Sequence, residues 1–146
     1  AWLPASLVLA FSFGFAFVGG TGYGIVCAVV FPAAASKVGG RAETAMMRHG
    51  LSIIYDERND QAIATYPTAH RVMAFDGASG AVTAVIDTSR MGLRYPCGIA
   101  LLPDGVHYAV TGYWENLFIF ERRTHRLVRD LCQYPVFFGH SHISVG

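Results

Sequence analysis

Histidine is the residue type whose position in this chain most directly suggests chemistry. The chain has 6 histidines, and His140 and His142 are separated by a single residue, a spacing that places both rings on the same side of an extended segment. An imidazole can bind a metal ion or transfer a proton near neutral pH. The two rings could therefore share a metal site, or they could be loop residues that hydrogen-bond to neighbouring segments.

A second candidate group is the sequence Tyr113-Trp114-Glu115-Asn116. It combines two aromatic rings with a carboxylate and an amide. Together these groups could bind a small molecule or, with further oxygen ligands, a divalent cation. Trp114 could equally well pack against a neighbouring part of the fold.

Composition and motifs argue against several classes of function. Lys+Arg 11 and Asp+Glu 10 give a net charge of +1, so no nucleic-acid partner is predicted. The sequence contains no G-x-S-x-G nucleophile elbow, H-E-x-x-H zinc motif, phosphate loop or dinucleotide fingerprint. Cys27, Cys97 and Cys132 form no C-x-x-C pair, so neither a zinc ribbon nor a disulfide scaffold is predicted, and the redox compartment stays open.

The elements that must position these residues are arranged in repeats. The segment 96–102 aligns with the segment 4–10, proline on proline and apolar residue on apolar residue. The segment 75–82 aligns with 31–38 on one side and with 120–127 on the other. The period is therefore about 45 residues.

Each repeat consists of short apolar or alternating runs separated by turn residues, a pattern typical of β-strands. Residues 49–90 predict strands at 51–55, 61–65, 71–75 and 81–86. The next repeat predicts strands at 98–102, 107–111, 117–120 and 126–131, with a tight turn at Pro103-Asp104-Gly105. Four short strands per repeat indicate a β-propeller blade.

The sequence thus predicts an all-β fold, a β-propeller fragment of about three four-stranded antiparallel blades whose ring is not closed. The blades cover roughly residues 3–45, 49–90 and 97–132, and a fourth begins at 139–146, so that 1–146 forms a single partial domain. The remaining blades are expected outside this chain. Because the charge-free run 1–36 contains a proline and several glycines, we expect a blade there; the alternative is a membrane or signal segment.

The repeat beginning at Pro96 also carries a resemblance to a known family. Residues 96–105 have the pattern Pro-x-Gly-Ile-Ala-x-x-Pro-Asp-Gly, and a strand, a loop and an Ile-Phe-acid strand follow. This pattern resembles the bacterial YVTN and quinoprotein-amine-dehydrogenase-like β-propellers. The match is clear in this repeat, weaker in the preceding one and weakest in the first. The segment 137–142 is also similar to a bacterial periplasmic propeller family, and a periplasmic or secreted protein is implied.

In such propellers the loop that enters each inner strand and the loop between the second and third strands open on one face, where ligands usually bind. The resemblance therefore implies a single ligand-binding face. Three histidines, His49, His140 and His142, occupy equivalent entry loops and could hold a divalent metal ion, the one cofactor that we consider. The predicted ligand-binding residues are His49, Tyr66, His70, Arg94, Tyr113, Trp114, Glu115, Asn116, His140 and His142.

Two classes of function remain. The first is a ligand- or partner-binding propeller, part of an exported bacterial protein, whose loops bind a small molecule or a protein without chemistry. The alternative is a propeller enzyme of the lactonase or dehydrogenase-subunit type, in which His and Glu side chains act as acid, base or metal ligands. The sequence shows no complete catalytic constellation, which favours binding. The basic run 121–126, with Arg129 beyond it, is predicted to be a solvated rim.

Overall fold

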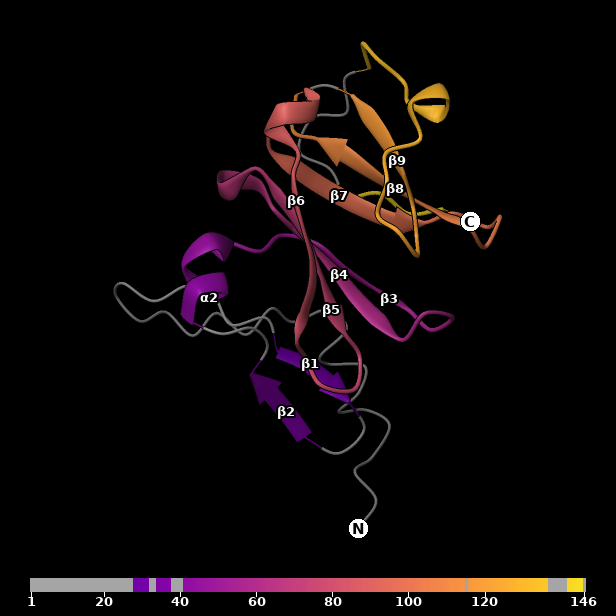
Figure 1. The fold of residues 1–146 in the computed structure, drawn as a ribbon. Helices are drawn as coiled ribbons and strands as arrows, with labels where there is room; N and C mark the ends of the chain where they lie inside the picture. Colours follow the sequence, from indigo (N-terminus) through magenta and orange to yellow (C-terminus); the bar gives the residue numbers. More distant parts are fainter. Residues whose placement is uncertain (1–27, 32–33, 38–40, 115, 137–141, 146) are drawn as a thin grey trace.

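The computed structural model of this chain is predominantly β (Figure 1). The structure describes residues 28–31, 34–37, 41–114, 116–136 and 142–145. A hairpin of β1 (Ala28–Phe31) and β2 (Ala34–Lys37) is followed by helix α2 (Arg41–Met47). The first sheet contains β3 (Ile53–Asp56), β4 (Gln61–Tyr66), β5 (Arg71–Asp76) and β6 (Val82–Asp87), and the second contains β7 (Pro96–Leu101), β8 (His107–Gly112) and β9 (Leu117–Glu121). The described residues also form three single-turn 3₁₀ helices, η1 (Pro67–Ala69), η2 (Ser89–Met91) and η3 (Arg129–Leu131).

Both sheets are antiparallel meanders in which each strand pairs with the next one along the chain. The four strands predicted for residues 49–90 all form, so the all-β prediction is confirmed at this level. In the second sheet three predicted strands form, but residues 126–131 make no regular fourth strand. Instead, isolated bridges join Leu127 to Phe120 and Gln133 to Leu117, with η3 between them.

The predicted first blade falls largely outside the described residues, since residues 1–27 are not among them. Its described part contains the β1–β2 hairpin and helix α2. Of the helices that the structure describes, none has the length and apolar character needed to cross a bilayer.

Aspartates close the tight turns of both sheets. At the β5–β6 turn, Asp76 Oδ1 accepts hydrogen bonds from the Ser79 amide at 2.8 Å and from its hydroxyl at 2.6 Å. At the β7–β8 turn, Asp104 Oδ1 accepts from the amides of Val106 and His107, and its Oδ2 accepts from His107 Nδ1 at 2.7 Å. The bond from the His107 ring contributes most to lowering the pKa of Asp104, to about 2. Local side-chain chemistry therefore fixes these hairpins, as the turn residues predict.

The two sheets pack face to face, with the second sheet above the first in Figure 1. β7 contacts β3 and β4 across the interface. All residues of β4 are buried, because the opposite face of the first sheet is covered as well, in part by Met47 of α2. The buried residues between the sheets are Ile63, Val72, Ala74 and Ile86 from the first, Leu93 from the connection, and Ile99, Tyr108, Val110, Phe118 and Phe120 from the second.

A threonine hydroxyl closes the first strand pair of each sheet in the same way. Thr65 Oγ1 accepts a hydrogen bond from the Ser52 amide at 3.1 Å, and Thr111 Oγ1 accepts one from the Gly98 amide at 3.0 Å. Both donors and both acceptors are separated by the same 46 positions (98 − 52 and 111 − 65). Thr65 also donates to the carbonyl of Cys97 at 2.7 Å, so this hydroxyl joins the two sheets.

At the other end of the strands, a buried polar network joins the sheets. The Gln61 amide donates to the carbonyl of Arg122 at 2.7 Å, and Arg122 Nη1 lies 3.7 Å from Asp56 Oδ1. Arg122 also donates to the carbonyls of His107, at 3.0 Å, and Leu102. The prediction of a solvated rim is therefore wrong for Arg122, which is 9% exposed, while Arg123 is exposed.

The environment of Asp56 keeps its carboxylate ionised. Burial by itself raises the pKa of this carboxyl, but hydrogen bonds from the amides of Asn59 and Gln61 and the charge of Arg122 outweigh it and lower the pKa below the usual value. A lowered pKa stabilises the fold at neutral pH. That stabilisation is lost as the pH falls from the usual carboxyl pKa through the lower folded-state value.

The hydrogen bonds of Thr65 and Thr111 can be compared by replacing each threonine with valine. Valine keeps the shape of the side chain and removes the hydroxyl. Thr65→Val leaves the Ser52 amide and the Cys97 carbonyl without this partner, and we expect a loss of about 2 kcal/mol in the free energy of unfolding. Thr111→Val affects one amide, and we expect about 1 kcal/mol. Urea unfolding of both variants measures the difference, and an equal or smaller loss for Thr65→Val would contradict the role of this hydroxyl between the sheets.

Two adjacent arginines provide a matched test of the buried network. Arg122→Ala leaves Asp56 buried without its counter-charge, and we expect the free energy of unfolding to fall by about 3 kcal/mol. Arg123→Ala, at an exposed position, should change it by less than about 0.5 kcal/mol. Denaturant midpoints of the two variants decide the point: similar midpoints would mean that Arg122 has no role in stability.

Candidate functional site

Three loops meet at the edge of the sheets where β4, β6 and β8 end. We call this region the loop edge: residues 66–70, 88–95, 112–114 and 116. The Thr88 amide donates to the carbonyl of His70 at 3.0 Å, and the Tyr113 amide donates to the carbonyl of Tyr95 at 2.9 Å. The loop that precedes β5, the connection between the sheets and the loop that precedes β9 are therefore tied together through their backbones.

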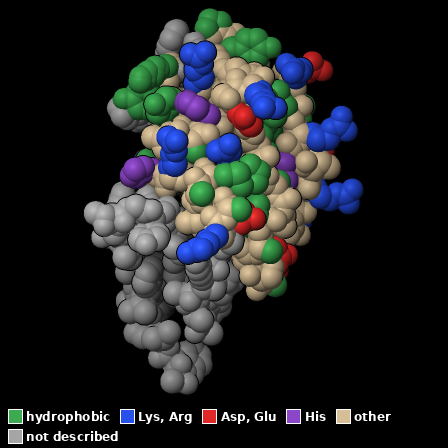
Figure 2. All heavy atoms as spheres, turned by 60° about the vertical axis from the view of Figure 1, so that its left-hand side comes forward, with side chains coloured by type: hydrophobic (Ala, Val, Ile, Leu, Met, Phe, Trp, Pro, Cys, Tyr) green, Lys and Arg blue, Asp and Glu red, His purple; other side chains and the backbone are tan. Residues whose placement is uncertain are grey.

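An aromatic cluster lies on the loop edge. The rings of Tyr113 and Trp114 are 3.8 Å apart between centroids, and the Tyr95 ring lies 6.0 Å from Trp114 and 6.2 Å from Tyr113. Tyr95 is 40% exposed and Trp114 is 50% exposed. Figure 2 brings this side of the molecule forward and shows basic side chains spread among hydrophobic groups and histidines. The cluster thus combines accessible aromatic surface with fixed ring positions.

His70 holds this cluster in place from the side. Its ring meets the Tyr95 ring edge to face, with 4.8 Å between centroids, and its Nδ1 accepts a hydrogen bond from the Tyr95 amide at 3.1 Å. His70, Tyr95 and Asn116 all have left-handed backbones, with φ of 52°, 51° and 74°. Such conformations are rare in non-glycine residues and often occur at binding sites.

Other residues of the predicted ligand-binding set are not members of the aromatic cluster. Tyr66 is fully buried and packs with Met47 on the far side of the first sheet, so it is a core residue. Arg94 and His49 are both exposed. Glu115 lies outside the described residues.

The predicted metal site depends on His49, His140 and His142. His140 lies outside the described residues, while His142 Nδ1 lies 2.8 Å from Ser52 Oγ, near the start of β3. Within the described part of the chain, no group of three His, Cys, Asp or Glu side chains is placed to hold a metal ion. The metal site therefore stays a prediction.

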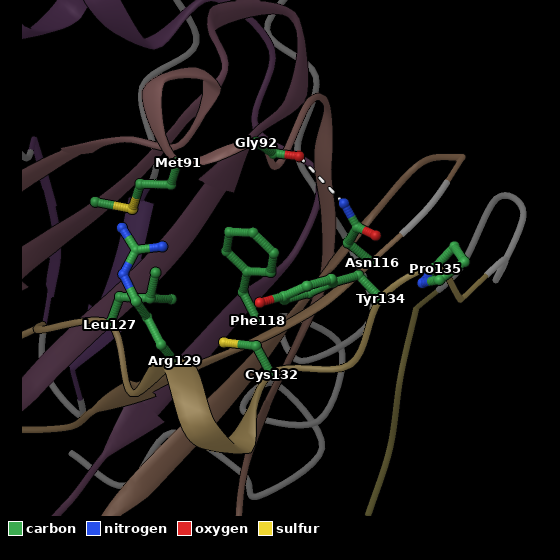
Figure 3. Close-up of a pocket in the computed structure, with 9 residues that line it drawn as sticks. All are labelled: Met91, Gly92, Asn116, Phe118, Leu127, Arg129, Cys132, Tyr134 and Pro135. Carbon is green, nitrogen blue, oxygen red and sulfur yellow. Dashed lines mark hydrogen bonds between the residues drawn. The ribbon is translucent and has the colours of Figure 1, made fainter.

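Asn116 connects the loop edge to a hollow of about 350 Å³ beside β9 (Figure 3). Its Nδ2 donates to the carbonyl of Gly92 at 3.2 Å, and its backbone amide donates to the carbonyl of Val136. The hollow also contains Phe118, Arg129 and Cys132. Because Phe118 and Arg129 belong to the predicted strands 117–120 and 126–131, the sequence patterns did not indicate this pocket.

The two described cysteines, Cys97 and Cys132, are both free thiols. Cys97 is buried, and burial raises the pKa of its thiol to about 11. Its Sγ donates to the carbonyl of Tyr95 at 3.2 Å. A thiol with this pKa is protonated at neutral pH, so Cys97 acts as a structural residue beneath the loop edge.

Tyr95 is the residue of the cluster that the site prediction omitted. The available signal was its place in an entry loop, immediately before Pro96.

No protein-family model matches this chain, and no curated protein matches its sequence. Its function must therefore be argued from the residues themselves.

The packing of Tyr95 against Trp114 is testable by fluorescence. The chain has two tryptophans, so Trp2→Phe leaves Trp114 as the single reporter. In that background, Tyr95→Ala should increase the quenching of Trp114 by acrylamide, because one of the two rings that shield it is lost. Tyr95→Phe keeps the ring and serves as the control. Equal quenching constants in the two variants would contradict the contact.

Proposed function

We propose that the two sheets are consecutive blades of a β-propeller and that the loop edge binds a ligand or partner protein without catalysing a reaction. The blade assignment is supported by the meander order, by face-to-face packing and by the threonine bond repeated after 46 positions. The resemblance to bacterial propellers further supports an exported protein, periplasmic or secreted.

The observation that carries the binding proposal is the aromatic cluster of Tyr95, Tyr113 and Trp114. Tryptophan and tyrosine are enriched among the residues that dominate binding energy at interfaces. Here the ring contacts and the backbone bonds of the loops hold the aromatic groups before any partner binds. A preorganised surface loses less conformational entropy on binding, which favours affinity.

The partner's chemistry follows from the surface. Exposed aromatic rings offer flat apolar area, and exposed Arg94 lies next to Tyr95 in the chain. A peptide segment that carries an aromatic or aliphatic anchor fits such a surface. The anchor would pack on the rings, while polar groups at the rim would set its orientation.

Selection of random displayed peptides on the whole chain tests this function. Selected peptides should lose about 30-fold in affinity for Trp114→Ala, because a hot-spot side chain contributes about 2 kcal/mol. Tyr55→Ala is the control, since Tyr55 is 40% exposed, close to the 50% of Trp114, but lies on β3, outside the loop edge. Peptides that bind both variants equally well, or no selected peptide that depends on Trp114, would contradict the proposal.

A further inference from the structure

The outer edge of the second sheet is interrupted beside β9. Two bridges, Phe120 to Leu127 and Leu117 to Gln133, attach the returning segment to this strand. Residues 118 and 119 lie between the bridges on β9, whereas residues 128–132 lie between them on the returning segment. The extra length is taken up by η3, which lies beside β9 without pairing with it as a strand. The hollow shown in Figure 3 lies at this interruption.

The hollow is lined by both apolar and polar groups. Figure 3 shows Phe118 at its centre, with Met91 on one side and Tyr134 on the other. Phe118 is 4% exposed and belongs to the core between the sheets, and its ring centroid lies 6.4 Å from that of Tyr134. The hollow is therefore an opening at the margin of the core, where Met91 and Tyr134 are accessible to a flat apolar group and Phe118 is almost completely covered.

Among the described residues that line the hollow, Arg129 has the single charged side chain. Arg129 is exposed, and no carboxylate of the described residues forms an ion pair with it. The neighbouring polar groups are neutral: the Asn116 amide donates to Gly92, and the Cys132 thiol donates to Val128. The charge of Arg129 therefore favours an anionic group at this end of the hollow.

We propose that the hollow binds a small organic anion with a flat apolar body, an aromatic carboxylate or sulfonate. The apolar body would lie against Met91 and Tyr134, and the acid group would pair with the Arg129 guanidinium. The volume of about 350 Å³ lies within the range of small-molecule sites. This site is additional to the aromatic cluster and shares Asn116 with the loop edge.

The first test measures the affinity of the fluorescent probe 1-anilinonaphthalene-8-sulfonate for the whole chain. Arg129→Gln should weaken binding about tenfold, because a charge-assisted hydrogen bond is lost. Arg126→Gln changes the net charge equally at an exposed position outside the hollow, and it should leave the affinity unchanged. An equal effect of the two variants would overturn the proposal, because it would show attraction by net charge alone.

The second test uses Cys132, which lines the hollow, as a reporter. Saturating 1-anilinonaphthalene-8-sulfonate should slow the alkylation of Cys132 by iodoacetamide. Peptide mapping measures the rate of this alkylation. The anion 2-naphthoate should protect Cys132 too, whereas 2-naphthylmethylammonium, which has the same ring system and the opposite charge, should not. Unchanged alkylation, or equal protection by the cation, would overturn the site.

The same probe separates this site from the loop edge. Trp114→Ala should leave binding of 1-anilinonaphthalene-8-sulfonate and protection of Cys132 unchanged. A loss of both in Trp114→Ala would assign the probe to the aromatic cluster and overturn the proposal for the hollow. Peptide binding at the loop edge, tested separately, is unaffected by either result.

Discussion

The apolar core between the two sheets is the constraint on which the other features depend. Ile63 and Val72 of the first sheet pack with Tyr108 and Phe118 of the second, so neither sheet can shift without exposing both. Polar ties act at the two ends of this core. Thr65 bonds to the Cys97 carbonyl near the loop edge, and the Arg122 network closes the opposite end. Together, the core and its ties fix the spacing and the alignment of the sheets.

This alignment explains how the loop edge forms. Each loop alone is short and carries one or two aromatic residues, but fixed strand ends bring the rings of Tyr95, Tyr113 and Trp114 into contact. The left-handed backbones of His70 and Tyr95 are unfavourable for side-chain-bearing residues. Burial in the core offsets that cost, and the result is a preorganised aromatic surface.

The interruption of the outer edge of the second sheet has a different cause from the order of the loop edge. There the chain provides more residues than β9 can pair, and η3 replaces a continuous strand. A hollow lies at this place, lined by the core residue Phe118 together with Arg129 and Cys132. The second sheet thus combines a rigid loop edge with an irregular margin, and each creates a different binding surface.

The sequence by itself determined the strands of residues 49–90 and the turn at Asp104, because alternation of side chains and turn chemistry are local properties. It also indicated the loops that carry His70, Tyr113 and Trp114. Only the tertiary structure decided that Tyr66 and Arg122 are buried, that Tyr95 joins the aromatic cluster, and that the strand predicted at 126–131 is interrupted. These outcomes depend on which faces the sheets turn toward each other and on how many residues must fit between two bridges. Both are set by contacts between residues distant in the sequence, which local patterns do not encode.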